Sequence, residues 1–179
     1  KKWAKRDKTK ASNWAPIPAL PKVTSIVPAA DRQAAIWRYT FTKPADDWMK
    51  SGFDDSPAAG APGGWQEGKS GFGTRNTPGA VIGTVWNTRE IWLRREIELP
   101  AGKASDPQAW LHHDEDAEVY INGVLALKLS GYVSGYDAFP LTPAGNTALK
   151  PGKNTIAIHC RQTGGGQYID FGLVDVEIR

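Results

Sequence analysis

The chain has very little cysteine and no long apolar stretch, and both absences narrow the classes of protein to which it can belong. Its 179 residues include one cysteine, so no disulfide can form within the chain. No segment reaches the roughly 18 consecutive apolar residues of a membrane-spanning helix, which excludes such a helix. No segment of about ten residues or more carries apolar residues at helical spacing either, so a helical fold is not expected.

Tryptophan, in contrast, is abundant, with eight residues in the chain. Large aromatic side chains bury much apolar surface on folding, so this content argues against disorder, collagen and coiled coils. The length fits one domain, because single hydrophobic cores of roughly 100–200 residues are the common case.

Positive charge is concentrated near the N-terminus. The chain has a net charge of +3 and a pI near 9.0. Residues 1–28 hold seven Lys or Arg and one Asp, a balance of +6, whereas the other 151 residues hold 15 basic and 18 acidic residues, a balance of −3. A nucleic-acid-binding fold carries its basic residues on the folded surface, so this division predicts no nucleic-acid partner.

The same N-terminal region is expected to lie outside the fold. Several prolines interrupt residues 1–29, and proline fixes φ and removes a backbone donor. We therefore predict a basic, proline-containing linker or strap over residues 1–29, and a single β-sandwich domain over residues 30–179. Because the chain starts without Met or a signal-peptide core, we expect it to be a piece of a larger protein. The alternative is a flexible tail that takes no part in the fold.

Alternating apolar residues predict β-strands throughout the rest of the chain. Six segments carry this pattern: 36–41, 91–99, 117–121, 124–129, 154–161 and 168–179. Asn122-Gly123 separates two of them and predicts a hairpin, because both residues tolerate positive φ. Arg95 interrupts the apolar face of its strand and needs a partner if it is buried. Many strands without helices predict an all-β fold, a β-sandwich or jelly roll.

Residues 43–87 form a long connection that contains nine of the 19 glycines. Long irregular segments of compact domains are usually functional or disordered. This one also contains five large aromatic residues, Trp48, Phe53, Trp65, Phe72 and Trp86. We therefore expect an ordered loop that packs across one side of the sandwich.

Three motifs occur in a characteristic order along the chain. They are Trp-Leu-Arg-Arg at 92–95, Asp-Ala-Glu-Val-Tyr-Ile-Asn-Gly at 116–123, and Leu-Lys-Pro-Gly-Lys-Asn at 149–154. In this order they resemble the galactose-binding-like jelly roll over roughly residues 35–179. The resemblance is in particular to the sugar-binding domain of glycoside hydrolase family 2 enzymes, and to accessory domains of bacterial glycan-degrading and glutaminase-A-like proteins.

This resemblance implies a non-catalytic module of a secreted, periplasmic or cell-surface protein. The family's catalytic carboxylates lie in a separate barrel, and many such sandwich domains are purely architectural. The residues themselves also favour no enzyme, since no Gly-x-Ser-x-Gly motif is present and Cys160 falls on an inward strand position.

A sugar-binding site needs an aromatic platform beside planar polar groups, because sugars present apolar C–H faces and a rim of hydroxyls. The residues that fit this description are Trp65, Trp86, Tyr132, Tyr136, Gln162 and Gln167, and the polar run at 112–116 adds His113 and Asp114. Two alternatives remain open. The aromatic residues can pack the loops onto the sheet, and Asp114 with Asp116 can cap the turn that enters the strand at residue 117.

No cofactor is expected apart from a possible structural calcium ion. Asp54 and Asp55 are the main carboxylates for it, with Asp46, Asp47 and Asp114 as further oxygen donors. A transition-metal site is not expected, because His159 has no histidine or cysteine partner at ligand spacing.

The leading hypothesis is therefore a carbohydrate-binding accessory module whose partners are a glycan and a neighbouring catalytic domain. The second is a structural module that packs against such a domain without a ligand of its own, and a stand-alone glycan hydrolase is a distant third. Exposure of the loop aromatics distinguishes the first two: a solvent-facing platform favours binding, and buried rings favour docking.

Overall fold

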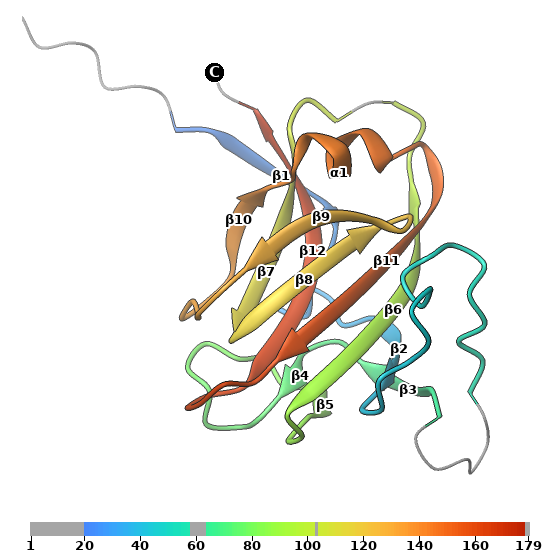
Figure 1. The fold of residues 1–179 in the computed structure, drawn as a ribbon. Coiled ribbons are helices and arrows are strands. Elements are labelled where there is room, and N and C mark those ends of the chain that lie inside the picture. The colour runs from blue at the N-terminus through green and yellow to red at the C-terminus, as the bar shows by residue number, and fades with distance from the viewer. Residues whose placement is uncertain (1–19, 58–63, 103, 178–179) are drawn as a thin grey trace, which may run out of the picture.

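Twelve strands and one short helix make up the described part of the chain, residues 20–57, 64–102 and 104–177 of the computed structural model (Figure 1). The strands are β1 (Lys22–Val27), β2 (Ile36–Thr40), β3 (Gln66–Lys69), β4 (Phe72–Gly73), β5 (Thr84–Val85), β6 (Glu90–Leu99), β7 (Pro107–Asp114), β8 (Asp116–Ile121), β9 (Val124–Leu129), β10 (Asp137–Pro140), β11 (Gly152–Arg161) and β12 (Tyr168–Glu177). The helix α1 (Pro143–Ala148) is capped by the Thr142 hydroxyl, which accepts a hydrogen bond from the Gly145 N–H.

The strands form two sheets packed face to face. Sheet A has the order β10-β7-β12-β4-β5, and β1 also pairs with β12. Sheet B has the order β3-β2-β6-β11-β8-β9. All pairs are antiparallel except β4 with β5. The all-β sandwich expected from the sequence is therefore confirmed, with a six-residue helix that the apolar pattern does not reveal.

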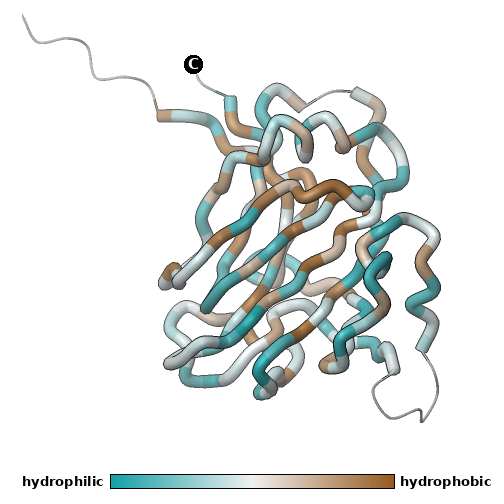
Figure 2. Tube along the Cα trace, viewed as in Figure 1, coloured by the Kyte–Doolittle hydropathy of each residue, from teal (hydrophilic) through white to brown (hydrophobic). Residues whose placement is uncertain are grey.

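The core lies between the sheets and is built from the residues that the alternation assigns to the inward faces. In Figure 2, hydrophobic and hydrophilic residues alternate along the long strands. Ile91, Leu93, Ile156, Ile158 and Cys160 are 0–1% exposed. Burial raises the pKa of the Cys160 thiol, in keeping with the inert buried thiol predicted for it. Within the described ranges, no helix has the length and apolar character that crossing a bilayer requires.

The predicted hairpin at Asn122-Gly123 is present, and the Asn122 side chain also bonds to neighbouring segments. Asn122 has φ of 51° and Gly123 has φ of 86°. The Asn122 side-chain amide donates to the Ala148 carbonyl at 2.8 Å, and its oxygen accepts from the Thr155 N–H at 2.8 Å. One turn residue thus ties the β8–β9 hairpin to β11 and to the end of α1.

Arg95 finds only part of the compensation that its inward position requires, since its Nη1 is buried without a hydrogen-bond partner in the described structure. Its guanidinium lies 5.9 Å from the centre of the Trp37 ring. Burial lowers the pKa of Arg95, and the negative charge of Asp170 acts in the opposite direction. The charge is therefore balanced by an aromatic face and a more distant carboxylate rather than by a direct ion pair within the described residues.

The predicted boundary between linker and sandwich is wrong, because part of residues 1–29 belongs to sheet A. Lys22–Val27 forms β1 and pairs antiparallel with β12 from Lys22↔Glu177 to Val27↔Leu173. The sequence analysis missed this strand because its first four residues are exposed and give no apolar alternation. The fold starts at about Lys22, and residues 1–19 lie outside the described part.

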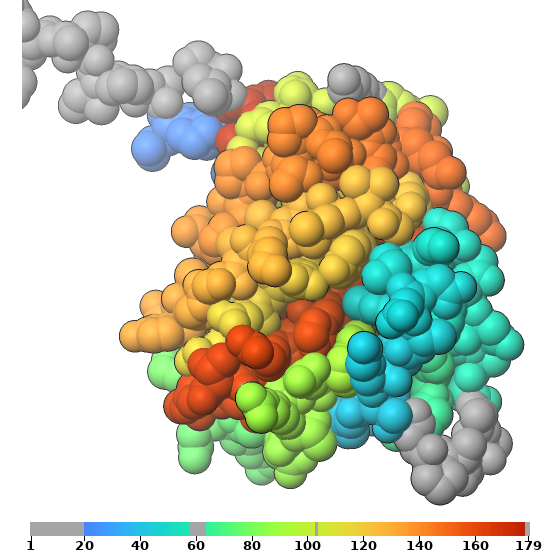
Figure 3. Space-filling model, viewed as in Figure 1, coloured from blue at the N-terminus to red at the C-terminus, as the bar shows by residue number. Residues whose placement is uncertain are grey.

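The long connection at 43–87 is ordered where it is described, as expected, but it is not one loop. It contains β3, β4 and β5, and its aromatics divide between two places. Trp48, Phe53 and Trp65 pack with Trp92 on the outer face of sheet B, whereas Phe72 and Trp86 enter the main core. In Figure 3 the segment after β2 (cyan) covers part of this outer face beside β6 and β11.

Arg94 of β6 holds this segment on the sheet. Its side chain is 4% exposed, and Nε donates to the Asp55 carboxylate at 2.8 Å. Nη1 donates to the carbonyls of Trp48 and Lys50, and the guanidinium lies 5.3 Å from the centre of the Phe53 ring. The buried guanidinium of Arg94 thus donates to three acceptors in the segment that follows β2.

Replacing Arg94 is expected to release this segment. Arg94→Met keeps most of the volume but removes all the donors, and hydrogen bonds to charged groups contribute about 1.5–3 kcal/mol each. We expect the free energy of unfolding to fall by about 2–4 kcal/mol in urea denaturation, together with faster proteolysis within residues 43–57. The matched control is Arg38→Met, since Arg38 pairs with Glu67 at a more exposed position. Equal losses in the two variants would contradict the anchoring role of Arg94.

Candidate functional site

Five connecting segments meet at one end of the sandwich, the lower end in Figure 1, which we call the loop end. They are residues 74–83, 86–89, 114–116, 130–136 and 162–167. Apart from Trp65, the residues predicted to bind sugar lie in these segments or beside them. The structure therefore brings together residues that are up to 81 positions apart in the sequence, from Trp86 to Gln167.

A groove with a volume of about 410 Å³ opens at the loop end. It is lined by Asn87, Thr88, Arg89, Arg161, Gln162, Thr163, Gly164 and Gln167, and we call it the polar groove. In Figure 3 the β11–β12 turn (red) and the start of β6 (light green) lie side by side at this end. The lining contains two guanidinium groups and three side-chain amides, but no carboxylate.

Trp86 anchors one wall of the groove from below. It is 0% exposed, its backbone N–H donates to the Gly73 carbonyl at 3.1 Å, and its indole N–H donates to the Thr88 hydroxyl at 3.1 Å. The Thr88 hydroxyl in turn donates to the Glu90 carbonyl at 3.0 Å. The prediction that Trp86 stacks on a sugar is wrong, because its ring belongs to the core and holds the loop that carries Asn87 and Arg89.

Gln167 anchors the other wall. Its side-chain amide donates to the Thr88 carbonyl at 2.6 Å, and its backbone exchanges hydrogen bonds with the buried Thr77 hydroxyl at 2.8 and 3.1 Å. A further bond runs from the Gln162 N–H to the Arg89 carbonyl at 2.8 Å. The two walls are thus joined to each other, and the donor predicted to meet sugar hydroxyls on Gln167 is used within the protein.

Gln162 holds the turn at the edge of the groove. Its amide nitrogen donates to the carbonyls of Gly165 and Gly166, which closes the turn between β11 and β12. Its oxygen Oε1 has no hydrogen-bond partner in the described structure, but it is buried and therefore does not face a ligand in the groove.

Asn87 and Arg89 are the polar side chains that the groove leaves available. Both are exposed, and neither makes a side-chain hydrogen bond or ion pair with the described part of the chain. Arg161 is partly engaged, since Nη2 donates to the Asp116 carboxylate at 3.1 Å. None of the three was predicted from the sequence. Two features of the sequence could have indicated them: the polar run Asn87-Thr88-Arg89 after Trp86, and the position of Arg161 next to Gln162.

His113 and Asp114 support the loop end but do not line the groove. His113 is 2% exposed, and its Nδ1 lies 2.6 Å from the Glu115 carbonyl oxygen. Burial and the neighbouring Glu115 charge raise the pKa of Asp114, whose carboxylate lies so close to Gly166 that an added Cβ there would approach it to 2.3 Å. The expected sugar contact of His113 is therefore wrong, and Asp114 packs against the glycine turn.

The two tyrosines predicted to bind sugar, Tyr132 and Tyr136, lie in different environments. Tyr132 is 70% exposed, and its backbone bridges to Asp114. The adjacent Gly131 N–H donates to Asp116, the partner of Arg161, so the loop that carries Tyr132 is linked to a residue of the groove, although Tyr132 is not one of the lining residues. Tyr136 instead stacks on Trp110 and donates to the buried carboxylate of Asp170 at 2.7 Å.

Asp170 joins three distant segments on the outer face of sheet A. It accepts hydrogen bonds from the Ala30 N–H at 2.6 Å, the Gly71 N–H at 3.2 Å and the Tyr136 hydroxyl at 2.7 Å. Burial raises the pKa of Asp170 to about 6, although these donors oppose the shift. Burial and the Asp170 charge also raise the pKa of Tyr136 far above its usual range, so this phenol stays a hydrogen-bond donor.

Trp65 belongs to the aromatic cluster on the outer face of sheet B and is not part of the loop end. It is 9% exposed and meets Phe53 edge-on at 6.1 Å on the outer face of sheet B. Its predicted role as a sugar platform is wrong, because packing of the long connection buries its ring. Two of the four predicted aromatics are therefore core residues, a third is held in a polar cluster, and Tyr132 alone of these four presents an open face.

The carboxylates proposed for calcium do not form a cation site. Asp55 is paired with Arg94, and Asp54 accepts a hydrogen bond from the Ser56 N–H at 3.0 Å, which lowers its pKa. Among the residues that the structure describes, no group of three or more His, Cys, Asp or Glu side chains is arranged to hold a metal ion. The donor set therefore does not fit calcium at this position.

Comparison with known proteins identifies the fold. No family model and no curated protein matches the sequence. Solved structures do match: a glycosyl hydrolase family 2 member from Bacteroides cellulosilyticus (16% identity, TM-score 0.50), a beta-glycosidase from Bacteroides vulgatus (18%, 0.50) and a beta-glucuronidase from glycoside hydrolase family 2 (15%, 0.52). These matches cover 84%, 85% and 90% of this chain but 20%, 20% and 18% of those chains. The expected fold relationship is confirmed, and the chain corresponds to one domain-sized part of such enzymes.

The raised pKa of Asp170 predicts a pH-dependent stability. The folded state binds the proton more tightly than the unfolded state, whose pKa is near 3.8, so the contribution is fully present below about pH 4 and is lost as the pH rises to about 6. The loss amounts to about 2–3 kcal/mol, since one pKa unit is about 1.4 kcal/mol.

Urea denaturation between pH 4 and 7.5 measures this effect, with Asp170→Asn as the reference. Relative to the variant, the free energy of unfolding of the wild type should fall between about pH 4 and 6 and then stay constant up to pH 7.5. A difference between the two proteins that does not change with pH would show that Asp170 has an ordinary pKa.

Proposed function

We propose that the chain is a non-catalytic accessory domain of a longer glycan-degrading protein and that it binds carbohydrate at the polar groove. The likeness to one domain-sized part of several glycosidases supports the accessory role. The observation that carries sugar binding is the groove itself. Its two walls are joined by hydrogen bonds, and the side chains of Asn87 and Arg89, both on the wall formed by residues 86–89, have no partners among the described residues.

This arrangement suits sugar hydroxyls. The exposed amide of Asn87 offers a donor and an acceptor in one plane, and the exposed guanidinium of Arg89 offers paired donors. Because the backbone of both walls is already tied down, little ordering entropy is lost on binding. Tyr132 adds an exposed ring for stacking on a C–H face. With one tyrosine in place of the expected tryptophans, we expect affinities in the range of about 10 μM to 1 mM.

The groove offers no acid–base pair for hydrolysis. General acid–base catalysis at a glycosidic bond uses two carboxyl groups, and no carboxylate lines the groove. The nearest ones are engaged: Asp116 with Arg161 and Glu115 with the Thr163 hydroxyl. These contacts support a binding role, with the catalytic groups in a neighbouring domain and the whole protein secreted, periplasmic or at the cell surface.

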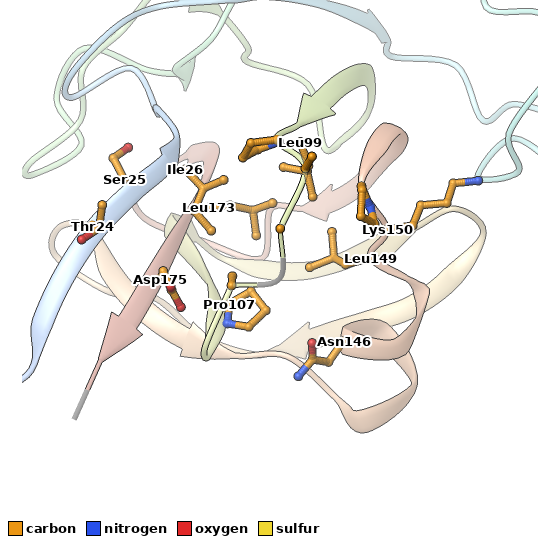
Figure 4. Close-up of a pocket in the computed structure, with 15 residues that line it drawn as sticks. Thr24, Ser25, Ile26, Leu99, Pro107, Asn146, Leu149, Lys150, Leu173 and Asp175 are labelled. Carbon is orange, nitrogen blue, oxygen red and sulfur yellow. The ribbon is translucent and has the colours of Figure 1, made fainter. Parts of the chain in front are cut away.

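A second candidate function is docking against that neighbouring domain, and a separate surface favours it. An apolar groove of about 710 Å³ lies at the end opposite the loop end (Figure 4). Ile26, Leu99, Leu149 and Leu173 face one another across it, from β1, β6, the segment after α1 and β12. Both ends of the described fold, β1 and the end of β12, border this groove, so a domain joined to either end can reach it.

Sugar binding is tested by affinity gel electrophoresis of the chain against a panel of plant, algal and host polysaccharides, followed by titration calorimetry with the best oligosaccharide. Asn87→Ala and Tyr132→Ala should each weaken binding about 5–10-fold, since each removes one exposed contact of about 1 kcal/mol. Asn146→Ala, an exposed asparagine at the opposite end, is the matched control and should bind as the wild type does.

Two results would contradict sugar binding at this groove. One is the absence of retardation by every polysaccharide in the panel. The other is binding that Asn87→Ala and Tyr132→Ala leave unchanged, because the ligand would then occupy another surface.

Docking is tested in the longer protein by calorimetry. Domains that share an apolar interface unfold together, so Ser25→Arg, which places a charge at the exposed rim of the apolar groove, should split one transition into two or lower the shared midpoint by several degrees. Leu125→Arg adds the same charge to exposed β9 and should leave the transition unchanged. Identical traces for both variants would exclude this groove as the interface.

A further inference from the structure

We infer that the polar groove selects sugars that carry an acid group, a carboxylate or a sulfate, over neutral sugars. This inference rests on the proposed function, because it names the class of glycan that the same groove takes. Three features of the groove support it: the charge of the lining, the state of the nearby acids and the use of the backbone acceptors.

The lining is positively charged. Arg89 and Arg161 both contribute to it, and none of the eight lining residues is acidic. Arg161 shares one nitrogen with Asp116, whereas Arg89 has no ion-pair partner among the described residues. An exposed guanidinium in a confined groove favours an anion that can accept two parallel N–H bonds, as carboxylate and sulfate oxygens do.

The acids near the groove are engaged elsewhere. Glu90 pairs with His159 at 2.9 Å, Asp116 with Arg161 at 3.1 Å, and Glu115 with the Thr163 hydroxyl. None of these carboxylates faces Arg89 at ion-pair distance in the described structure. Beyond residues 1–28 the chain is net acidic by three charges, so the positive character of the groove is local.

The backbone carbonyls of the groove wall that carries Arg89 already accept hydrogen bonds within the protein. The Thr88 carbonyl accepts from the Gln167 amide at 2.6 Å, and the Arg89 carbonyl accepts from the Gln162 N–H at 2.8 Å. The groups left facing the groove are therefore mainly donors, from Asn87, Arg89 and Arg161. A ligand rich in acceptors, and an anion above all, complements such a surface.

Asn87 is the exception, and its side chain suits the sugar part of the ligand. It is exposed, and its amide offers an acceptor for a hydroxyl as well as a donor. A sugar acid therefore fits the groove, with an acid group for the guanidinium groups and a hydroxyl for Asn87. Nucleic acid fits less well, because it needs an extended basic surface rather than one groove of about 410 Å³.

The test uses the chain with oligogalacturonate and its methyl ester, which are the same sugar with and without the charge. In titration calorimetry at low salt, we expect the acid to bind at least about 10-fold more tightly than the ester, and added NaCl to weaken the acid alone. Arg89→Gln should reduce binding of the acid about 10-fold and leave the ester nearly unchanged. Lys153→Gln removes an exposed charge outside the lining and is the matched control.

A second arm distinguishes the two acid groups. Tight binding of dextran sulfate but not of dextran, lost in Arg89→Gln, would support the inference and assign the acid as sulfate rather than carboxylate.

The outcomes separate this inference from the function on which it rests. Binding of a sugar with no preference in either pair, neither for the acid over the ester nor for dextran sulfate over dextran, would overturn the acid preference and leave sugar binding intact. Binding of none of these glycans and of no neutral polysaccharide would overturn both. Binding of a single-stranded oligonucleotide as tight as that of the best acidic glycan would show attraction to any polyanion and would also overturn the inference.

Discussion

The buried carboxylate of Asp170 is the contact on which the arrangement of sheet A depends. It lies on the central strand β12, which pairs with β7 at this position, whereas on the other edge neither β4 nor β1 reaches it. Its carboxylate accepts hydrogen bonds from segments that are 140, 99 and 34 positions away in the sequence. A charge in this position is costly unless donors surround it. The backbone of Ala30 and Gly71 and the hydroxyl of Tyr136 meet that requirement, and in doing so they fix the chain entering β2, the loop before β4 and the segment before β10.

The loop end is organised by the same principle, polar groups satisfied across long sequence distances. Thr77, Thr88, Gln162 and Gln167 join three loops to one another, while Trp86 fills the core beneath them. Residues that suggest ligand contacts in the sequence thus serve mainly to hold the groove rigid. The backbone of the loop that carries Asn87 and Arg89 is held by this framework, so that binding at the proposed site would require little ordering of the loop.

The molecule has two ends with different chemistry. The loop end carries a polar, cationic groove, and the opposite end carries an apolar groove beside β1 and the end of β12. The proposed ligand site and the proposed docking surface therefore lie at opposite ends of the strands, so that both can be occupied together. The buried aromatics on the outer face of sheet B take no part in either surface, since the long connection covers them.

The order and inward faces of the main strands, the Asn122-Gly123 hairpin, the buried Cys160 and the all-β class could be predicted from the sequence, because strand alternation and turn chemistry are local properties. The start of the fold could not, since β1 is held by pairing with β12 rather than by its own apolar pattern. The roles of Trp65, Trp86 and Gln167 were equally undetermined, because a loop residue becomes a ligand contact or a core anchor according to which distant segment packs over it. Only the tertiary structure decided that Asn87, Arg89 and Arg161 share a groove, since two chain segments about 70 positions apart had to meet before their donors faced the same space.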